Sequence, residues 1–102
     1  MGIPRGTTPT ITLTFSDENL DLTQAEHVVV SFRGGGTIEK ADSELEIAAR
    51  SISVFLSQSE TLTLAKGEIA VQVNWTYSDG MRAASNFAGF RLTENLVGRV
   101  IE

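Results

Sequence analysis

The longest regular pattern in the chain covers residues 68–77. Apolar side chains alternate there with polar or small ones, and those that share one face are Ile69, Val71, Val73, Trp75 and Tyr77. A period of two is typical of a β-strand with one buried face. Asp79-Gly80 comes next, a strong signal for a two-residue hairpin turn, and a second run covers residues 82–92. We therefore predict a β-hairpin around which the rest of the chain is organised.

A two-residue turn would fix which residues face each other across this hairpin. The predicted pairs are Trp75 with Ala84, Val73 with Asn86, Val71 with Ala88, Ile69 with Phe90 and Glu68 with Arg91. Large side chains then face small ones beside the turn, and opposite charges meet at the far end, which stabilises a strand pair. Asn86 is a polar residue on the apolar face, so we expect it near the rim or hydrogen-bonded inside.

Shorter alternating runs predict five more strands. They cover residues 10–15, 27–33, 37–40, 44–47 and 51–56. Ser57 and Glu60 have the spacing of a helical capping box, which predicts a short helical turn near residues 58–65. About seven strands with only short helical pieces predict an all-β fold, an antiparallel immunoglobulin-like β-sandwich.

The inward positions of these strands define a predicted core. Its members are Trp75, Ile69, Val71, Val73, Ile11, Leu13, Val28, Val30, Ile52 and Val54. Trp75 is the largest of them, and we expect it to be mostly buried.

The chain divides into three predicted parts. Residues 1–8 contain glycine and proline and form an extended N-terminal arm. Residues 9–92 form the sandwich, and residues 93–102 form a C-terminal tail or short helix. Leu96, Val97, Val100 and Ile101 are spaced for one side of such a helix, which needs a surface to pack on. That surface is either the chain's own sandwich or a neighbouring subunit.

Composition excludes several classes of function. The formal net charge is −5 and no basic stripe occurs, so we expect no nucleic-acid partner. The chain has no cysteine, which excludes disulfides and thiolate chemistry. No apolar run reaches the ~20 residues of a membrane span, and no signal region opens the sequence. We expect a protein made and kept inside the cell that synthesises it, without contact to a membrane.

No residue pattern indicates catalysis, a metal or a cofactor. His27 is the only histidine and lacks partners for a metal, so we expect it at the surface. Gly34-Gly35-Gly36 lacks the lysine of a phosphate-binding loop and predicts a flexible turn. Glu44 and Glu46 share a strand face, and we interpret them as solvated. We predict no enzyme activity, no cofactor and no small-molecule substrate.

Three segments resemble a known family. They are the strand and loop of residues 10–25 with its Leu20-Asp21-Leu22-Thr23 motif, the strand 28–33 ending in Arg33, and the run 67–80 ending in Asp79-Gly80. These are similar to the N-terminal immunoglobulin-like domain of phage baseplate upper proteins, and the chain also resembles small proteins encoded among the tail genes of prophages in gut Firmicutes. Such proteins usually continue into a receptor-binding or fibre-attachment region, whereas this sequence stops at Glu102.

The resemblance implies a structural protein of a phage or prophage tail or baseplate, made in the bacterial cytoplasm and carried in the virion. Its partners would be other tail or baseplate proteins, with a homo-oligomer as a further possibility. The candidate contact residues are Leu96, Val97, Val100, Ile101 and Ile3. The alternative is a carbohydrate-binding or adhesion module in which Trp75, Tyr77 or Phe87 stacks on a sugar.

Overall fold

A computed structural model describes residues 2–102; Met1, the first residue of the predicted arm, lies outside the described residues. The strands found in residues 2–102 are β1 (Ile3–Pro4), β2 (Thr10–Thr14), β3 (His27–Arg33), β4 (Thr37–Ala41), β5 (Leu45–Ile47), β6 (Ser51–Phe55), β7 (Gly67–Thr76), β8 (Arg82–Ala84) and β9 (Ala88–Thr93). The helical pieces are α1 (Gln58–Thr63) and two 3₁₀ turns, η1 (Leu22–Gln24) and η2 (Asp42–Glu44). The prediction of a mostly β chain with a short helical turn is confirmed.

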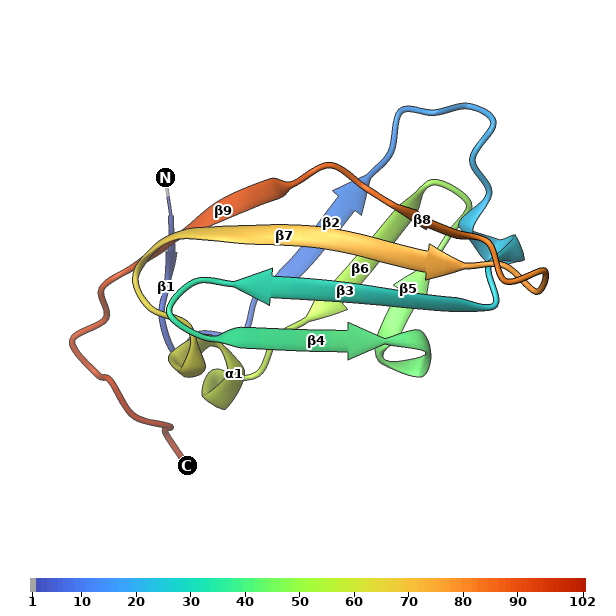
Figure 1. Cartoon of the computed structure of the whole chain (residues 1–102). Helices are drawn as coiled ribbons and strands as arrows, with labels where there is room; N and C mark the ends of the chain where they lie inside the picture. Colours follow the sequence, from blue (N-terminus) through green and yellow to red (C-terminus); the bar gives the residue numbers. More distant parts are fainter. Residues whose placement is uncertain (1) are drawn as a thin grey trace.

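The strands form two sheets that lie one behind the other (Figure 1). The larger sheet has the order β1-β9-β7-β3-β4, with β8 paired to β7 beyond β9, and the smaller has the order β2-β6-β5. The expectation of a purely antiparallel fold is wrong in one place, because β1 runs parallel to β9. The seven predicted strands become nine in the described residues because the arm contributes β1 and the predicted strand 82–92 divides into β8 and β9.

The core lies between the two sheets. Its buried apolar residues are Leu22, Val28, Val30, Phe32, Ile52, Val54, Leu56, Leu64, Ile69, Val71, Val73, Trp75 and Leu92. Trp75 is 7% exposed, so its predicted burial is confirmed. Ile11 and Leu13 are only partly buried, because β2 is an edge strand of the smaller sheet.

The turn between β7 and β8 differs from the two-residue turn predicted at Asp79-Gly80. Tyr77 N–H donates to the Met81 carbonyl (2.9 Å) and Gly80 N–H donates to the Tyr77 carbonyl (2.9 Å), so the loop has three residues. Gly80 has φ +86°, and Asp79 does not have a positive φ. This is the glycine position of a three-residue hairpin loop, and the type I′ prediction is wrong.

A β-bulge then separates β8 from β9. Asn74 pairs with Ala84 and Val71 pairs with Ala88, so three residues (85–87) lie opposite two (72–73). Ser85 bridges the interruption, because its N–H donates to the Val73 carbonyl (2.8 Å) and its Oγ accepts from Val73 N–H (3.0 Å). One extra residue in one strand is the defining feature of a bulge.

The bulge decides which predicted pairs are correct. The pairs of Trp75 with Ala84 and Val73 with Asn86 are wrong, and Trp75 instead faces Ala83. The three pairs farther from the turn are confirmed: Val71 with Ala88, Ile69 with Phe90 and Glu68 with Arg91. The longer turn shifts the pairing of β7 with β8 by one residue from the prediction, and the bulge restores the predicted pairing between β7 and β9.

Helix α1 begins at the predicted capping box. Ser57 Oγ accepts from Glu60 N–H (3.3 Å), and Glu60 Oε1 accepts from Ser57 N–H (2.9 Å). Glu60 also forms a partly buried ion pair with Lys40 of β4 (2.7 Å). Desolvation raises the pKa of Glu60, but its hydrogen bonds with Lys40 and Ser57 outweigh this effect and leave the pKa below its usual value.

The glycine turn between β3 and β4 packs against the segment that follows α1. Ala65 N–H donates to the Gly34 carbonyl (2.7 Å). Gly35 has φ +71°, and a Cβ atom there would lie 2.5 Å from the Ala65 Cβ. The expectation of a loose, flexible turn is therefore wrong, because residues far away in the sequence enclose it.

The N-terminal segment is bound to the body of the protein. Ile3 packs against the core beside β9, and Arg5 donates to the Leu62 (2.7 Å) and Leu64 (2.8 Å) carbonyls at the end of α1. Thr61 is fully buried; its hydroxyl accepts from Gly6 N–H (2.9 Å) and donates to the Thr7 carbonyl (2.9 Å). These bonds make residues 3–7 part of the folded unit.

Candidate functional site

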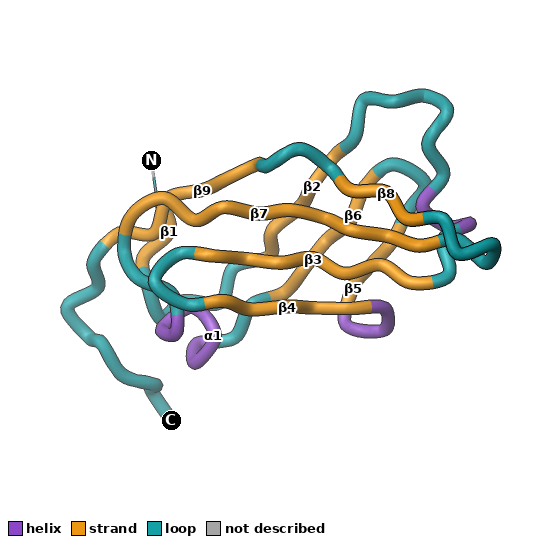
Figure 2. Tube along the Cα trace, viewed as in Figure 1, coloured by secondary structure: helices purple, strands orange, loops and turns teal. Residues whose placement is uncertain are grey.

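The C-terminal tail, residues 94–102, is the first candidate surface. It contains no helix, and it runs from the end of β9 past α1 as an irregular segment (Figure 2). The sequence left open whether this segment is a short helix or an irregular tail, and the structure shows an irregular tail. The predicted helix is absent because Asn95 and Gly98 interrupt so short a segment.

The apolar side chains of the tail are mostly outside the protein core. The exposed fraction is 98% for Leu96, 61% for Ile101, 41% for Val97 and 40% for Val100. Ile3, the fifth predicted contact residue, is partly buried against the core instead. The structure thus separates Ile3, which packs within its own chain, from four tail residues that leave apolar surface in water.

A few polar contacts hold the tail to its own chain. Asn95 Nδ2 donates to the Arg5 carbonyl (2.7 Å). The Gln58 amide accepts from Ile101 N–H (2.8 Å) and donates to the Ile101 carbonyl (3.2 Å). The two bonds to Gln58 are exposed, and such hydrogen bonds contribute about 0.5–1.5 kcal/mol each, so the end of the tail can exchange them for others.

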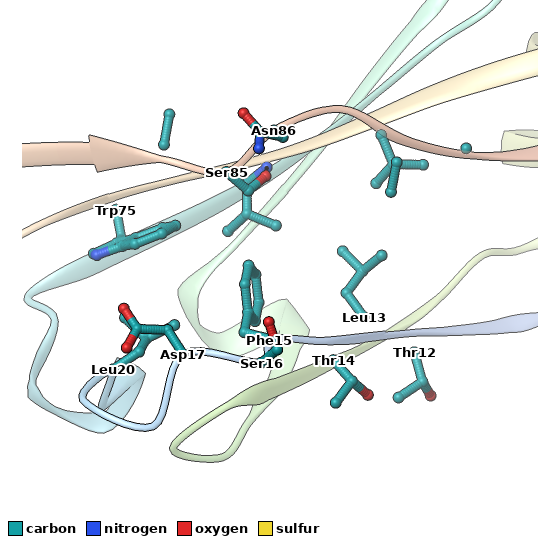
Figure 3. A pocket seen from close by; sticks show the side chains of 15 residues that line it. Thr12, Leu13, Thr14, Phe15, Ser16, Asp17, Leu20, Trp75, Ser85 and Asn86 are labelled. Atoms are coloured by element: carbon teal, nitrogen blue, oxygen red, sulfur yellow. Dashed lines mark hydrogen bonds between the residues drawn. The ribbon is translucent and has the colours of Figure 1, made fainter.

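The second candidate surface is an open groove between the two sheets. Its volume is about 790 Å³, and it lies where the edge of β2 faces β7, β8 and the bulge. Figure 3 shows Leu13, Phe15 and Trp75 directed into it, with Ser85 and Asn86 across from β2. Phe15 and Trp75 meet edge to face, with ring centroids 6.0 Å apart. Asp17 is the charged residue among its lining residues.

The strand along this groove has an unpaired edge. Phe15 N–H donates to the Arg50 carbonyl (2.8 Å) and Leu56 N–H donates to the Pro9 carbonyl (3.0 Å), so the odd-numbered residues of this region pair with β6. In an antiparallel ladder the backbone groups of the even-numbered residues then point outward. Those residues are Thr10, Thr12 and Thr14, and within residues 2–102 no strand pairs with them.

The aromatic residues considered for sugar stacking lie in three different settings. Trp75 is buried, and its indole Nε1–H donates to the Tyr77 hydroxyl (3.0 Å). Phe87, in the bulge, is 73% exposed and borders a small depression with Ser31, Arg33 and Gln72. Tyr77 is partly buried against the core. Phe87 is therefore the one of these three with a freely exposed ring.

The polar residues singled out from the sequence do not converge. His27 is exposed and contacts Asp42 (Nδ1 to Oδ2, 3.1 Å). The Val28 N–H and the His27 ring lower the pKa of Asp42. Glu44 and Glu46 are exposed, and Glu44 accepts from Ala41 N–H (3.1 Å). Within residues 2–102, no three His, Cys, Asp or Glu residues lie close enough to hold a metal ion.

Two comparisons and one topological finding complete the description. No protein-family model matches the chain, and no curated protein is significantly similar to it in sequence. In the part of the chain that the structure describes, no helix is long and apolar enough to cross a membrane.

Sequence reasoning found the exposed tail but missed the groove. The groove is lined by Ser85 and Asn86 of the bulge, which lie opposite residues 12–17 in and after β2. Asn86 on the apolar face was the one local signal, because a polar residue there disagrees with an uninterrupted strand. It is exposed at the groove, as the rim alternative predicted.

Proposed function

We propose that this chain is a non-catalytic assembly protein of a phage or prophage tail or baseplate, built on an immunoglobulin-like sandwich. Its partners are other tail or baseplate proteins and further copies of itself, and its place is the virion. The observation that carries the proposal is the apolar tail, whose Leu96 and Ile101 are 98% and 61% exposed. Exposed apolar clusters on small proteins commonly mark contact surfaces.

Two further features support an assembly role. The molecule is elongated, with extents of 47, 25 and 20 Å, and it has an unprotected strand edge at β2. The polar residues with potential chemistry are scattered and exposed, as His27, Glu44 and Glu46 show. The resemblance of residues 10–25, 28–33 and 67–80 to baseplate upper proteins connects these physical features with a phage particle.

The location of the protein in phage particles tests the proposal. The bacterium that encodes the chain is treated to induce its prophages, the particles are separated on a density gradient, and each fraction is analysed by peptide mass spectrometry. We expect peptides of this chain to co-sediment with tail proteins at a constant ratio. A chain found only among free proteins, while tails are present in the gradient, would contradict the proposal.

One observation favours a carbohydrate-binding module as the second candidate. Phe87 presents an exposed ring beside Ser31, Arg33 and Gln72, and a ring next to polar groups suits stacking on a sugar. Titration with oligosaccharides, followed by NMR shifts of the Phe87 ring, tests this alternative. Shifts that saturate and vanish in Phe87→Ala would support it, and unchanged spectra would remove it.

A further inference from the structure

The β2 edge is the least protected strand edge in the described residues. Its sequence, Thr10-Ile11-Thr12-Leu13-Thr14, has high β propensity, no charge and no proline. The other outer edges are shorter or carry charge or proline. Strand β4 carries Glu39 and Lys40, and β9 carries Arg91 and pairs with β1 at its C-terminal end. Strands β5 and β8 have three residues each, and β1 has two, of which one is proline. Open, uncharged edges accept an added strand, and proteins usually block them.

The tail has the properties of a strand that could be added. The eight residues 95–102 span about 26 Å when extended, which exceeds the length of five-residue β2. In an extended segment Leu96 and Val100 fall on the same face, with Gly98 between them. Both could thus point into the groove while the tail backbone pairs with the outward groups of β2.

The tail and the groove of one molecule face different ways. The tail turns toward α1, where Gln58 binds the backbone of Ile101, whereas the segment that follows β2 leaves the end of that strand farthest from α1 (Figure 1). We propose that residues 95–102 of one copy bind along the outer edge of β2 in a second copy. The inference rests on the proposed function and deepens it by naming a self-contact.

Such a contact joins two different surfaces, a tail and a groove. Two copies that exchange tails reciprocally form a closed dimer, whereas one-way binding leaves a free tail and a free groove and gives a ring or a filament on repetition. The contact at Gln58 is given up in the process, and a strand ladder of several hydrogen bonds replaces it.

Two full-length variants test the two halves of the contact separately. Leu96→Asp places a charge on a tail side chain that is 98% exposed, so the monomer fold is unaffected. Thr12→Pro removes an outward N–H from β2 and an exposed side-chain hydrogen bond to Ser53 (3.1 Å), but no backbone bond to β6, a position where edge strands tolerate proline. Glu39→Pro, on the opposite edge strand β4, is the matched control.

Sedimentation velocity over a concentration series is the measurement, with thermal melting to show that each variant is folded. We expect concentration-dependent oligomers for the unmodified chain and for Glu39→Pro. We expect at least a tenfold higher concentration for half-assembly in Leu96→Asp and Thr12→Pro.

Mixing the two variants gives the decisive result. Leu96→Asp retains its groove and Thr12→Pro retains its tail, so an equimolar mixture should form a one-to-one dimer that grows no further. A strictly monomeric unmodified chain, or a mixture that stays monomeric while the unmodified chain assembles, would overturn the inference. Neither result touches the proposed place of the chain in phage tails, which would fail only if the chain were absent from the tail particles.

Discussion

For the glycine turn between β3 and β4, the sequence and the structure predict different effects of a substitution on stability. A flexible triple-glycine turn predicts that Gly35→Ala is mild, and a type I′ turn at Asp79-Gly80 predicts that Gly80→Val is severe. In the structure both residues have positive φ, +71° and +86°. A new Cβ at Gly80 meets nothing within 4 Å, whereas at Gly35 it meets the Ala65 Cβ at 2.5 Å and the Ala65 N at 3.3 Å.

These contacts determine the size of the two effects. Positive φ costs an alanine about 1–2 kcal/mol at either site, and the loss of chain entropy in the unfolded state returns roughly 0.4–1 kcal/mol. Overpacking against Ala65 adds about 1–3 kcal/mol at Gly35 alone. We therefore expect Gly35→Ala to lower the free energy of unfolding by about 1–3 kcal/mol more than Gly80→Ala does.

Urea denaturation of both variants measures this difference. A gap of this size is a large fraction of the roughly 5–15 kcal/mol that stabilises a domain of this length. Equal losses in the two variants, or a greater loss in Gly80→Ala, would refute the reasoning that Ala65 encloses the turn.

Three further predictions follow from the core and from α1. Trp75→Ala should lower the free energy of unfolding by about 3–5 kcal/mol, and a thermal melt within a degree or two of the unmodified chain would contradict its role in the core. Thr61→Val keeps the shape but leaves Gly6 N–H without its acceptor, so denaturation should show a loss of about 1–3 kcal/mol. Glu60 has a folded-state pKa below its usual value, so its contribution is present above the unfolded-state pKa and is lost as the pH falls through the folded one. Unfolding measured from neutral to acid pH should therefore show a smaller loss of stability in Glu60→Gln than in the unmodified chain, and identical pH profiles would exclude the effect.

The parts of the fold that the sequence predicted correctly depend on local patterns. The alternation from Ile69 to Trp75 determined the face that is buried, and the Ser57–Glu60 spacing located the start of α1. Both signals are contained in a few neighbouring residues, so no knowledge of the tertiary structure was needed.

The parts that were missed depend on contacts between distant segments. The bulge at Ser85 is stabilised by a side-chain bond to Val73, and the turn at Gly35 is enclosed by Ala65. Strand β1 forms because Ile3 meets Leu92, near the other end of the chain. The groove is lined by segments that are far apart in the sequence, residues 12–20, 71–75 and 84–89, so no single local pattern predicts it.

We propose that the chain works by assembly through its tail and its open β2 edge. Disulfide trapping tests it directly, because the chain has no cysteine of its own. Leu96→Cys and Asn86→Cys are prepared as separate variants, mixed and oxidised gently, and the linked peptides are identified by mass spectrometry. Leu96→Cys mixed with Glu39→Cys is the control. We predict cross-links between positions 96 and 86 far above the control, and equal yields in the two mixtures would contradict the claim.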